Sequence, residues 1–211
     1  MTQAHSTNHI QEIVVRNIVK EDLDAVAELS MKCFGPDMSL KRAHIESQLE
    51  IFPEGQICLE YKGEIVGSAL SLIVNFDDYG EKHTYYEICD QGFIRNHNPN
   101  GRNLYGIEVG VNEEFRGMQL GRRLYEGRRR ICKELNLDSI LIGGRMPFFY
   151  KYAEQMNADE YAQEVMKGKI YDPVLTFQMK NGFELNKVIA GYLPKDEESL
   201  EYGALMEWKN E

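Results

Sequence analysis

The chain has 211 residues, of which 43% are hydrophobic and 27% charged, and its formal net charge at pH 7 is −10. This composition is typical of a globular protein with one sizeable core, and the acidic excess argues against general nucleic-acid binding, which requires a basic surface. Because no apolar run is long enough to span a bilayer and the polar start lacks the apolar core of a secretory signal, we expect a cytoplasmic protein without membrane contact.

The spacing of cysteines and histidines indicates neither a disulfide framework nor a metal centre. The four cysteines are widely scattered without a Cys-x-x-Cys pair, and the five histidines form no zinc-binding motif. We therefore expect reduced thiols and no bound metal. Residues 1–12 are predicted to be a flexible tail, and residues 13–211 a single domain with a helical insertion at about 145–171.

The first half of the chain predicts short regular elements followed by a long excursion over the surface. Apolar spacing and chain breakers place these elements at residues 13–18 (strand), 23–34 (helix), 40–51 (helix) and 57–70 (hairpin). Lys62-Gly63 forms the hairpin turn, since glycine adopts the positive φ that a tight turn requires. The excursion covers 75–102, with a short strand or helix near Tyr85 to Cys89.

Residues 107–135 form the unit around which we expect the chain to be organised. An apolar alternation predicts a strand ending at Val111, and a helix follows whose apolar positions are Leu120, Leu124, Ile131 and Leu135. A buried strand at 139–144 completes a β-α-β crossover, so the two strands should be parallel and adjacent or nearly so. The free amides and dipole at the start of the helix suit a phosphate or pyrophosphate.

The last part of the chain predicts two helical segments and two strands. A helix begins at Ala158-Asp159-Glu160, and a second begins at Asp172-Pro173, with Asp172 as its cap. Asn181-Gly182-Phe183 ends this second helix. Strands follow at about 184–192 and 204–208, which completes a mixed sheet flanked by helices.

Two short motifs and this order of elements resemble the GNAT N-acetyltransferase superfamily. In Arg116-Gly117-Met118-Gln119-Leu120-Gly121, the first and last residues match the outer positions of the family's acyl-CoA loop, and Gln119 replaces its usual middle glycine. Asn181-Gly182-Phe183 is similar to the Gly-Phe pair that ends the family's fourth helix. The resemblance implies an α/β (mixed α+β) fold, with a mostly antiparallel sheet whose central parallel strands are splayed for acyl-CoA.

The segment from Gly106 to Trp208 also resembles the acetyltransferase-type region that precedes a carbon–nitrogen hydrolase domain in some bacterial proteins. The similarity includes Gly143-Gly144-Arg145 and Tyr192-Leu193-Pro194. On this resemblance the chain is either a free-standing relative or a separately made domain.

The family resemblance implies acetyl-CoA as cosubstrate and no metal. Backbone groups of Val109 and Val111 would pair with the pantetheine arm. The pyrophosphate would contact Arg116, Gly117, Met118, Gln119, Leu120 and Gly121. Arg122 and Arg123 either meet the nucleotide phosphate or belong to a solvated helix face, whereas the run 128–130 is expected to be exposed and without a functional role.

Acetyl transfer to an amine requires a base, an oxyanion donor and a proton for the departing thiolate. Glu108, a carboxylate on an apolar strand, is the candidate base, and a structural hydrogen-bonding role is its alternative. The family implies the Val109 amide as oxyanion donor. Many members have a tyrosine acid where this chain has Gln178, which cannot release a proton. The candidates to replace it are water and the tyrosines Tyr150, Tyr152 and Tyr171, with packing as the alternative for each tyrosine.

The leading hypothesis is an acetyl-CoA-dependent N-acetyltransferase acting on the primary amine of a small molecule or protein. The alternative is a non-catalytic acyl-CoA-binding sensor or accessory domain, which Gln178 favours. A nucleotide-binding protein is disfavoured because the chain has no P-loop motif. The insertion is expected to form a lid or a wall of the acceptor cleft. Glu87, Asp90 and Arg95 either line the opposite side of the cleft or are exposed loop charges. A homodimer is left open as the assembly.

Overall fold

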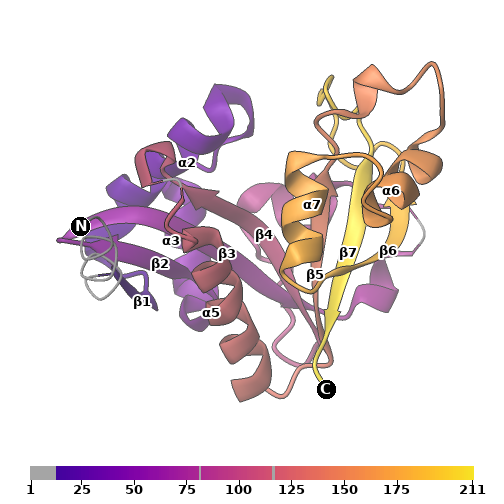
Figure 1. Ribbon diagram of the computed structural model, residues 1–211. Coiled ribbons are helices and arrows are strands. Elements are labelled where there is room, and N and C mark those ends of the chain that lie inside the picture. Colours follow the sequence, from indigo (N-terminus) through magenta and orange to yellow (C-terminus); the bar gives the residue numbers. More distant parts are fainter. Residues whose placement is uncertain (1–12, 81, 116) are drawn as a thin grey trace.

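A computed structural model describes residues 13–80, 82–115 and 117–211, so the predicted tail at 1–12 lies outside the described residues. The described strands are β1 (Ile13–Asn17), β2 (Ile57–Tyr61), β3 (Glu64–Val74), β4 (Asn103–Val111), β5 (Ser139–Arg145), β6 (Glu184–Ile189) and β7 (Gly203–Lys209). They form one sheet in the order β1-β2-β3-β4-β5-β7-β6 (Figure 1).

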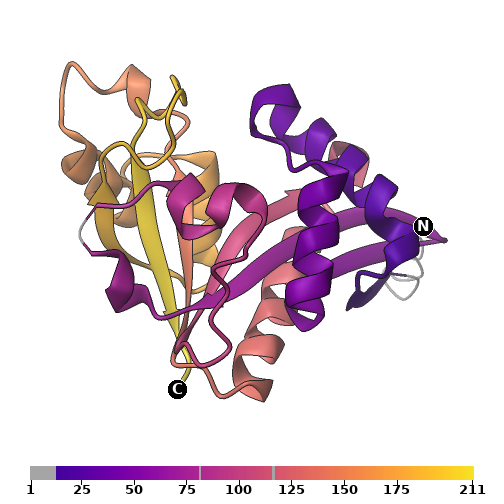
Figure 2. The same ribbon diagram turned by 180° about the vertical axis from the view of Figure 1, so that it is seen from behind.

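Helices cover both faces of this sheet. The α-helices are α2 (Leu23–Met38), α3 (Arg42–Ile51), α4 (Tyr85–Ile88), α5 (Leu120–Glu134), α6 (Ala158–Met166) and α7 (Pro173–Lys180). Short 3-10 helices are η1 (Lys20–Asp22), η2 (Pro53–Gly55), η3 (Phe76–Tyr79), η4 (Asp90–Gly92), η5 (Glu113–Phe115) and η6 (Phe149–Lys151). Helices α2 and α3 lie on the face opposite α5, as the front and back views show (Figures 1 and 2).

The central strands β4 and β5 run parallel, while every other neighbouring pair in the described sheet is antiparallel. Their pairing begins at Asn103 with Ser139 and ends at Gly106 with Ile142. Both strands continue beyond this point and diverge toward their carboxyl ends (Figure 1). The predicted mixed sheet with a splayed parallel pair is therefore confirmed, and the splay creates the opening that the site occupies.

Several predicted boundaries also agree with the structure. Asp172 caps α7 by accepting hydrogen bonds from the amides of Val174 and Leu175 at 2.9 and 3.0 Å. Asn157 caps α6, which begins at Ala158 as predicted. In the predicted hairpin turn, both residues have positive φ, 52° at Lys62 and 84° at Gly63. Local sequence signals were sufficient at these points because the capping or turn residue itself fixes the backbone.

The predicted break at Gly35-Pro36 is present, because Gly35 at φ 74° has a non-helical backbone and kinks α2, which then runs to Met38. Two other boundaries differ from the prediction. Strand β4 begins four residues before the predicted Ile107, since its early residues are buried between helices and lack the alternation of a half-exposed strand. Leu135 follows the end of α5 and is 41% exposed, so it does not belong to the helix's buried face.

Within the described ranges, no helix combines the length and apolar character that crossing a membrane requires. The same residues contain no group of three histidine, cysteine or acidic side chains arranged to hold a metal ion. All four cysteines are free thiols.

Candidate active site

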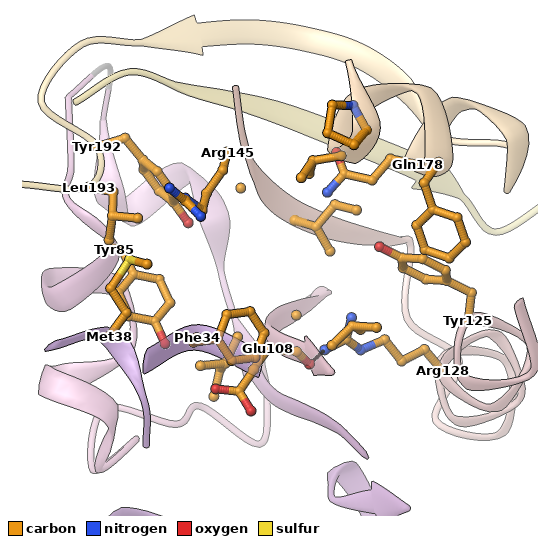
Figure 3. Close-up of a pocket in the computed structure, with 18 of the residues that line it drawn as sticks. Phe34, Met38, Tyr85, Glu108, Tyr125, Arg128, Arg145, Gln178, Tyr192 and Leu193 are labelled. Atoms are coloured by element: carbon orange, nitrogen blue, oxygen red, sulfur yellow. Dashed lines mark hydrogen bonds between the residues drawn. The ribbon is translucent and has the colours of Figure 1, made fainter. Parts of the chain in front are cut away.

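A cavity occupies the opening between β4 and β5. Helices α2, α4, α5 and α7 and the segment after β6 complete its wall (Figure 3). Polar and aromatic side chains that line it are Phe34, Tyr85, Tyr86, Glu108, Tyr125, Arg128, Arg145, Phe177, Gln178 and Tyr192. The cavity therefore combines an unpaired strand edge with a few titratable groups, which is the usual composition of a ligand site.

Glu108 is a buried carboxyl group in the wall of the cavity. Its side chain lies on β4 and is 7% exposed, and Oε2 accepts a hydrogen bond of 2.8 Å from the Ser30 hydroxyl. No described residue donates a hydrogen bond to Oε1. Burial raises the pKa of Glu108 to about 7, although the Ser30 bond and the charge of Arg128 oppose the rise. The carboxyl is thus poised to exchange a proton near neutral pH.

This raised pKa predicts an effect on stability. A carboxyl that titrates near 4.5 when unfolded and near 7 when folded adds stability below about pH 4.5, and this contribution is lost as the pH rises through 7. Glutamine does not titrate, so the Glu108→Gln variant lacks this pH-dependent loss of stability. The melting temperature of the variant minus that of wild type should therefore be larger at pH 8 than at pH 5. Thermal unfolding at both pH values measures this, and an unchanged difference would contradict the assigned pKa.

Arg128 lies beneath the same part of β4, and the predicted exposure of this arginine is wrong. Its side chain is 1% exposed, with Nε donating to the Ser71 hydroxyl at 3.1 Å. Nη2 donates to the carbonyl oxygens of Leu70 and Glu108 at 2.7 and 2.5 Å. These acceptors lie on both sides of a register shift between β3 and β4, which forms a β-bulge. Burial lowers the pKa of Arg128 to about 10, so the guanidinium remains charged at neutral pH and holds this bulge.

The predicted pyrophosphate loop precedes α5, and its Arg116 lies outside the described residues. Gly117 has φ 85°, and Gln119, the N-cap of α5, has φ 56° without a side-chain capping bond. The first amides of α5 are thus left without a capping side chain and can meet an anion. Leu120 is buried and Met118 packs partly against the core, so these two residues can offer only main-chain groups.

Gly121 has a packing role that the sequence did not indicate. A Cβ at this position would lie 2.5 Å from Cζ of Phe177 on α7. Close approach of α5 and α7 therefore requires glycine here, in addition to any contact with a phosphate. A bulky substitution at Gly121 would displace α7, so other residues offer a better test of the loop.

Arg122 and Arg123 differ in their surroundings. Arg122 is exposed near the start of α5, and its Nε lies 3.0 Å from a carboxylate oxygen of Glu126. Arg123 is turned toward β1, where Nη1 donates to the Ile13 carbonyl oxygen at 3.1 Å. Of the two, Arg122 is better placed to meet a ligand at the helix N-terminus.

Gln178 lies in the cavity wall, as its position in α7 predicts. It is 5% exposed, and its Oε1 accepts no hydrogen bond from any described residue. A Cβ at Gly144 would lie 2.4 Å from Oε1, so glycine in β5 allows Gln178 to approach the strand. Across from it, Tyr125 extends from α5 toward Gln178 (Figure 3). The sequence analysis missed Tyr125, since only the contact between α5 and α7 reveals its place.

The tyrosines predicted from the insertion lie elsewhere. Tyr150 and Tyr171 are 49% and 63% exposed, and neither lines the cavity. Tyr152 packs against Tyr161 with ring centroids 5.4 Å apart. The proposed acid role of these tyrosines stays a prediction, without support from the cavity. Of the predicted insertion, only its first residue, Arg145 at the end of β5, lines the cavity, and α7 and Tyr192-Leu193 supply the rest of that side.

The predicted charged residues of the excursion are also outside the cavity lining. Arg95 pairs with Asp90, with Nε and a carboxylate oxygen 2.5 Å apart. Glu87 accepts a hydrogen bond from the Thr84 amide and so caps α4. In their place, Tyr85 and Tyr86 of α4 border the cavity.

Sequence comparison finds a family match and two relatives of known source. A model described as "Acetyltransferase (GNAT) family" matches residues 23–147. "Probable hydrolase YhcX" of Bacillus subtilis (strain 168) is 50% identical over 97% of this chain, which spans 40% of the length of that relative. "Uncharacterized N-acetyltransferase YkwB" of the same organism is 35% identical, over 98% of this chain and 92% of the relative.

Solved structures of similar fold cover nearly the whole chain. The loading GNATL domain of CurA from Lyngbya majuscula has a TM-score of 0.83 at 23% identity, covering 93% of this chain and 97% of that domain. The GphF GNAT-like decarboxylase in complex with isobutyryl-CoA has a TM-score of 0.77 at 21% identity, covering 93% and 98%. The protein described as "yncA, a putative ACETYLTRANSFERASE" from Salmonella typhimurium, solved with its cofactor acetyl-CoA, has a TM-score of 0.56 at 14% identity, covering 94% of each.

Proposed function

This chain belongs to the GNAT acetyltransferase family, and from that premise we propose that it transfers an acetyl group from acetyl-CoA to the primary amine of a small molecule or protein. The observation that carries the proposal is the buried Glu108, whose pKa is raised to about 7 beside the splayed strand edge. A base of this pKa accepts the proton of an amine near neutral pH. The YkwB relative, described as an N-acetyltransferase, supports the same chemistry.

The residues of the cleft fit acetyl-CoA as cosubstrate. Val109 and Val111 pair with Ala69 and Gly67 of β3, and neither pairs with β5. Their strand therefore has an unpaired edge that can hydrogen-bond the amides of pantetheine. The start of α5 offers amides to the pyrophosphate. Among the structural neighbours, YncA is described with acetyl-CoA and GphF with isobutyryl-CoA, which supports an acyl-CoA ligand.

The proposed reaction uses two neighbouring groups that follow the register shift in β4. Glu108 takes a proton from the attacking amine, which then forms a bond to the thioester carbonyl carbon. The Val109 amide donates to the carbonyl oxygen as negative charge develops there. Arg128 acts on this step through the backbone, because its bond to the Glu108 carbonyl oxygen fixes the strand that carries both groups.

A second candidate function is acyl-CoA binding without transfer. Gln178 favours it, since an amide occupies the place of the family's tyrosine acid and cannot release a proton. An accessory domain of a larger hydrolase is one form of this function, in line with the match to part of YhcX.

Thiol release from acetyl-CoA, measured over a panel of polyamines, amino acids, aminoglycosides and peptides, separates the two candidates. Direct binding of acetyl-CoA is measured in parallel. We expect thiol release with at least one amine. Tight binding with no release for any amine would support the non-catalytic function, and failure to bind acetyl-CoA would contradict both.

Arg122→Ala is expected to weaken acetyl-CoA binding about 10-fold, from the loss of one charge-assisted contact to a phosphate. Arg130→Ala is the matched control, because Arg130 is also exposed on α5 and also faces a glutamate four residues on, Glu134. Arg130 lies near the opposite end of the helix and should leave affinity unchanged. Equal affinities for both variants in a calorimetric titration would remove Arg122 from the phosphate site.

A further inference from the structure

The wall formed by α5 and α7 contains a tyrosine hydroxyl beside Gln178. Tyr125 is 3% exposed and lines the cavity. Its ring packs against Phe177 and Phe183, with centroid distances of 5.5 and 5.0 Å. These contacts fix the ring, while its hydroxyl end extends from α5 toward Gln178 (Figure 3). Tyr125 thus offers an O–H group next to the position where the family's tyrosine acid is missing.

Burial disfavours the release of the Tyr125 proton, and two neighbouring groups oppose this effect. Burial raises its pKa, while the charge of Arg128 and the neighbouring Gln178 side chain act to lower it. The guanidinium carbon of Arg128 lies 5.9 Å from the centre of the ring. A positive charge at this distance stabilises a phenolate as it forms.

Two other tyrosines of the cavity, Tyr85 and Tyr192, lack this arrangement. Tyr85 and Tyr192 lie across the cavity from Tyr125 (Figure 3). The Tyr192 hydroxyl is engaged with that of Tyr105, with the two oxygens 2.5 Å apart. Burial raises the pKa of Tyr85 well above its usual value, and the charge of Glu108 raises it further. Of these three cavity tyrosines, Tyr125 is therefore the one whose phenolate a cation stabilises.

We propose that Tyr125 is the general acid of acyl transfer and donates its hydroxyl proton to the sulfur of the departing CoA, with Gln178 orienting the hydroxyl. This inference rests on the proposed transfer to an amine. The C–N bond forms as the C–S bond breaks, and the electron pair of the C–S bond stays on sulfur. Glu108 takes the proton of the amine and Tyr125 protonates the sulfur. Solvent then removes the proton from Glu108 and returns one to Tyr125.

Tyr125→Phe is expected to lower kcat about 100-fold, as the loss of a general acid does, with an unchanged dissociation constant for acetyl-CoA. Tyr202→Phe, which removes a hydroxyl outside the cavity lining, controls for loss of a tyrosine hydroxyl. The double variant Tyr125→Phe with Gln178→Tyr should recover part of kcat, since it puts an acid back on α7. A purely structural role for Tyr125 would not produce this recovery.

A second readout is independent of turnover. Because the Tyr125 hydroxyl would donate to the sulfur, the thiol of bound CoA should have a higher pKa in Tyr125→Phe than in wild type. The ultraviolet absorbance of the thiolate, followed against pH with CoA alone, measures this value. An equal thiol pKa in both proteins would overturn the contact with sulfur.

The outcomes separate the two proposals. If wild type releases thiol and Tyr125→Phe does so at the same rate, the acid assignment is overturned and acyl transfer stands. A large loss in Tyr85→Phe with none in Tyr125→Phe would also overturn it. If wild type releases no thiol with any amine, the proposed function fails and the acid role of Tyr125 fails with it.

Discussion

Glu108→Gln is expected to lower kcat about 100-fold while the dissociation constant of acetyl-CoA stays the same. The glutamate carboxylate can accept the proton of the amine, whereas a glutamine of almost the same shape cannot. Glu108 lines the cavity on the central strand, so the substitution removes a proton acceptor without changing the strand's backbone contacts. Steady-state thiol release together with a direct binding titration measures the two quantities separately.

The pH dependence of the rate gives a sharper test of the same group. With its pKa raised to about 7, Glu108 ionises as the pH rises, so wild-type kcat should increase up to about pH 7. This part of the profile should be absent from Glu108→Gln. Ser30→Ala removes a hydrogen bond that lowers the pKa, so the increase should move to higher pH. A wild-type rate in Glu108→Gln would exclude Glu108 as the base.

The fold was predictable where a local signal determined the backbone. The Lys62-Gly63 turn and the Asp172 cap each depend on residues within three positions of one another. The crossover from β4 through α5 to β5 followed from the spacing of two buried strands around one amphipathic helix. Strand limits were less predictable, because β3 and β4 are buried on both faces and their ends depend on distant neighbours.

A residue of the candidate site was predictable where its type was unusual for the strand or helix that contains it. Glu108 met this condition, as a carboxylate on an apolar strand, and it does line the cavity. Arg128 did not, since an arginine within a basic run on a helix usually faces solvent. Its burial depends on Gly106, where a Cβ would lie 2.7 Å from Nη1 of Arg128. No local pattern connects two positions on different elements in this way.

Tyr125 was missed for a related reason. Its place in the cavity depends on how closely α7 approaches α5 and β5, which Gly121 and Gly144 allow. On the family resemblance the acid belongs on α7, and the candidate tyrosines lie in the neighbouring insertion. The structure instead brings a tyrosine from α5 against Gln178, a contact between residues 53 positions apart in the chain.

Arg128→Leu is expected to reduce the free energy of unfolding by about 3–5 kcal/mol, because it leaves two carbonyl oxygens and one hydroxyl buried without their donor. The affected groups are the carbonyls of Leu70 and Glu108 and the hydroxyl of Ser71. Leucine fills part of the space but donates no hydrogen bond. Denaturant unfolding measures the change, with the exposed Arg130→Ala as a control that should alter stability by less than about 0.5 kcal/mol.

Arg128→Lys distinguishes the charge of this side chain from its shape. Lysine keeps the positive charge but concentrates its donors on one nitrogen, so it cannot span Ser71 on one side and the Leu70 and Glu108 carbonyls on the other. We expect a stability between those of wild type and Arg128→Leu, with kcat lowered because the bulge that carries Glu108 is no longer held. Full recovery by lysine would mean that charge alone is required. If Arg128→Leu lowers the free energy of unfolding by less than about 1 kcal/mol, the bulge forms without the hydrogen bonds of the guanidinium.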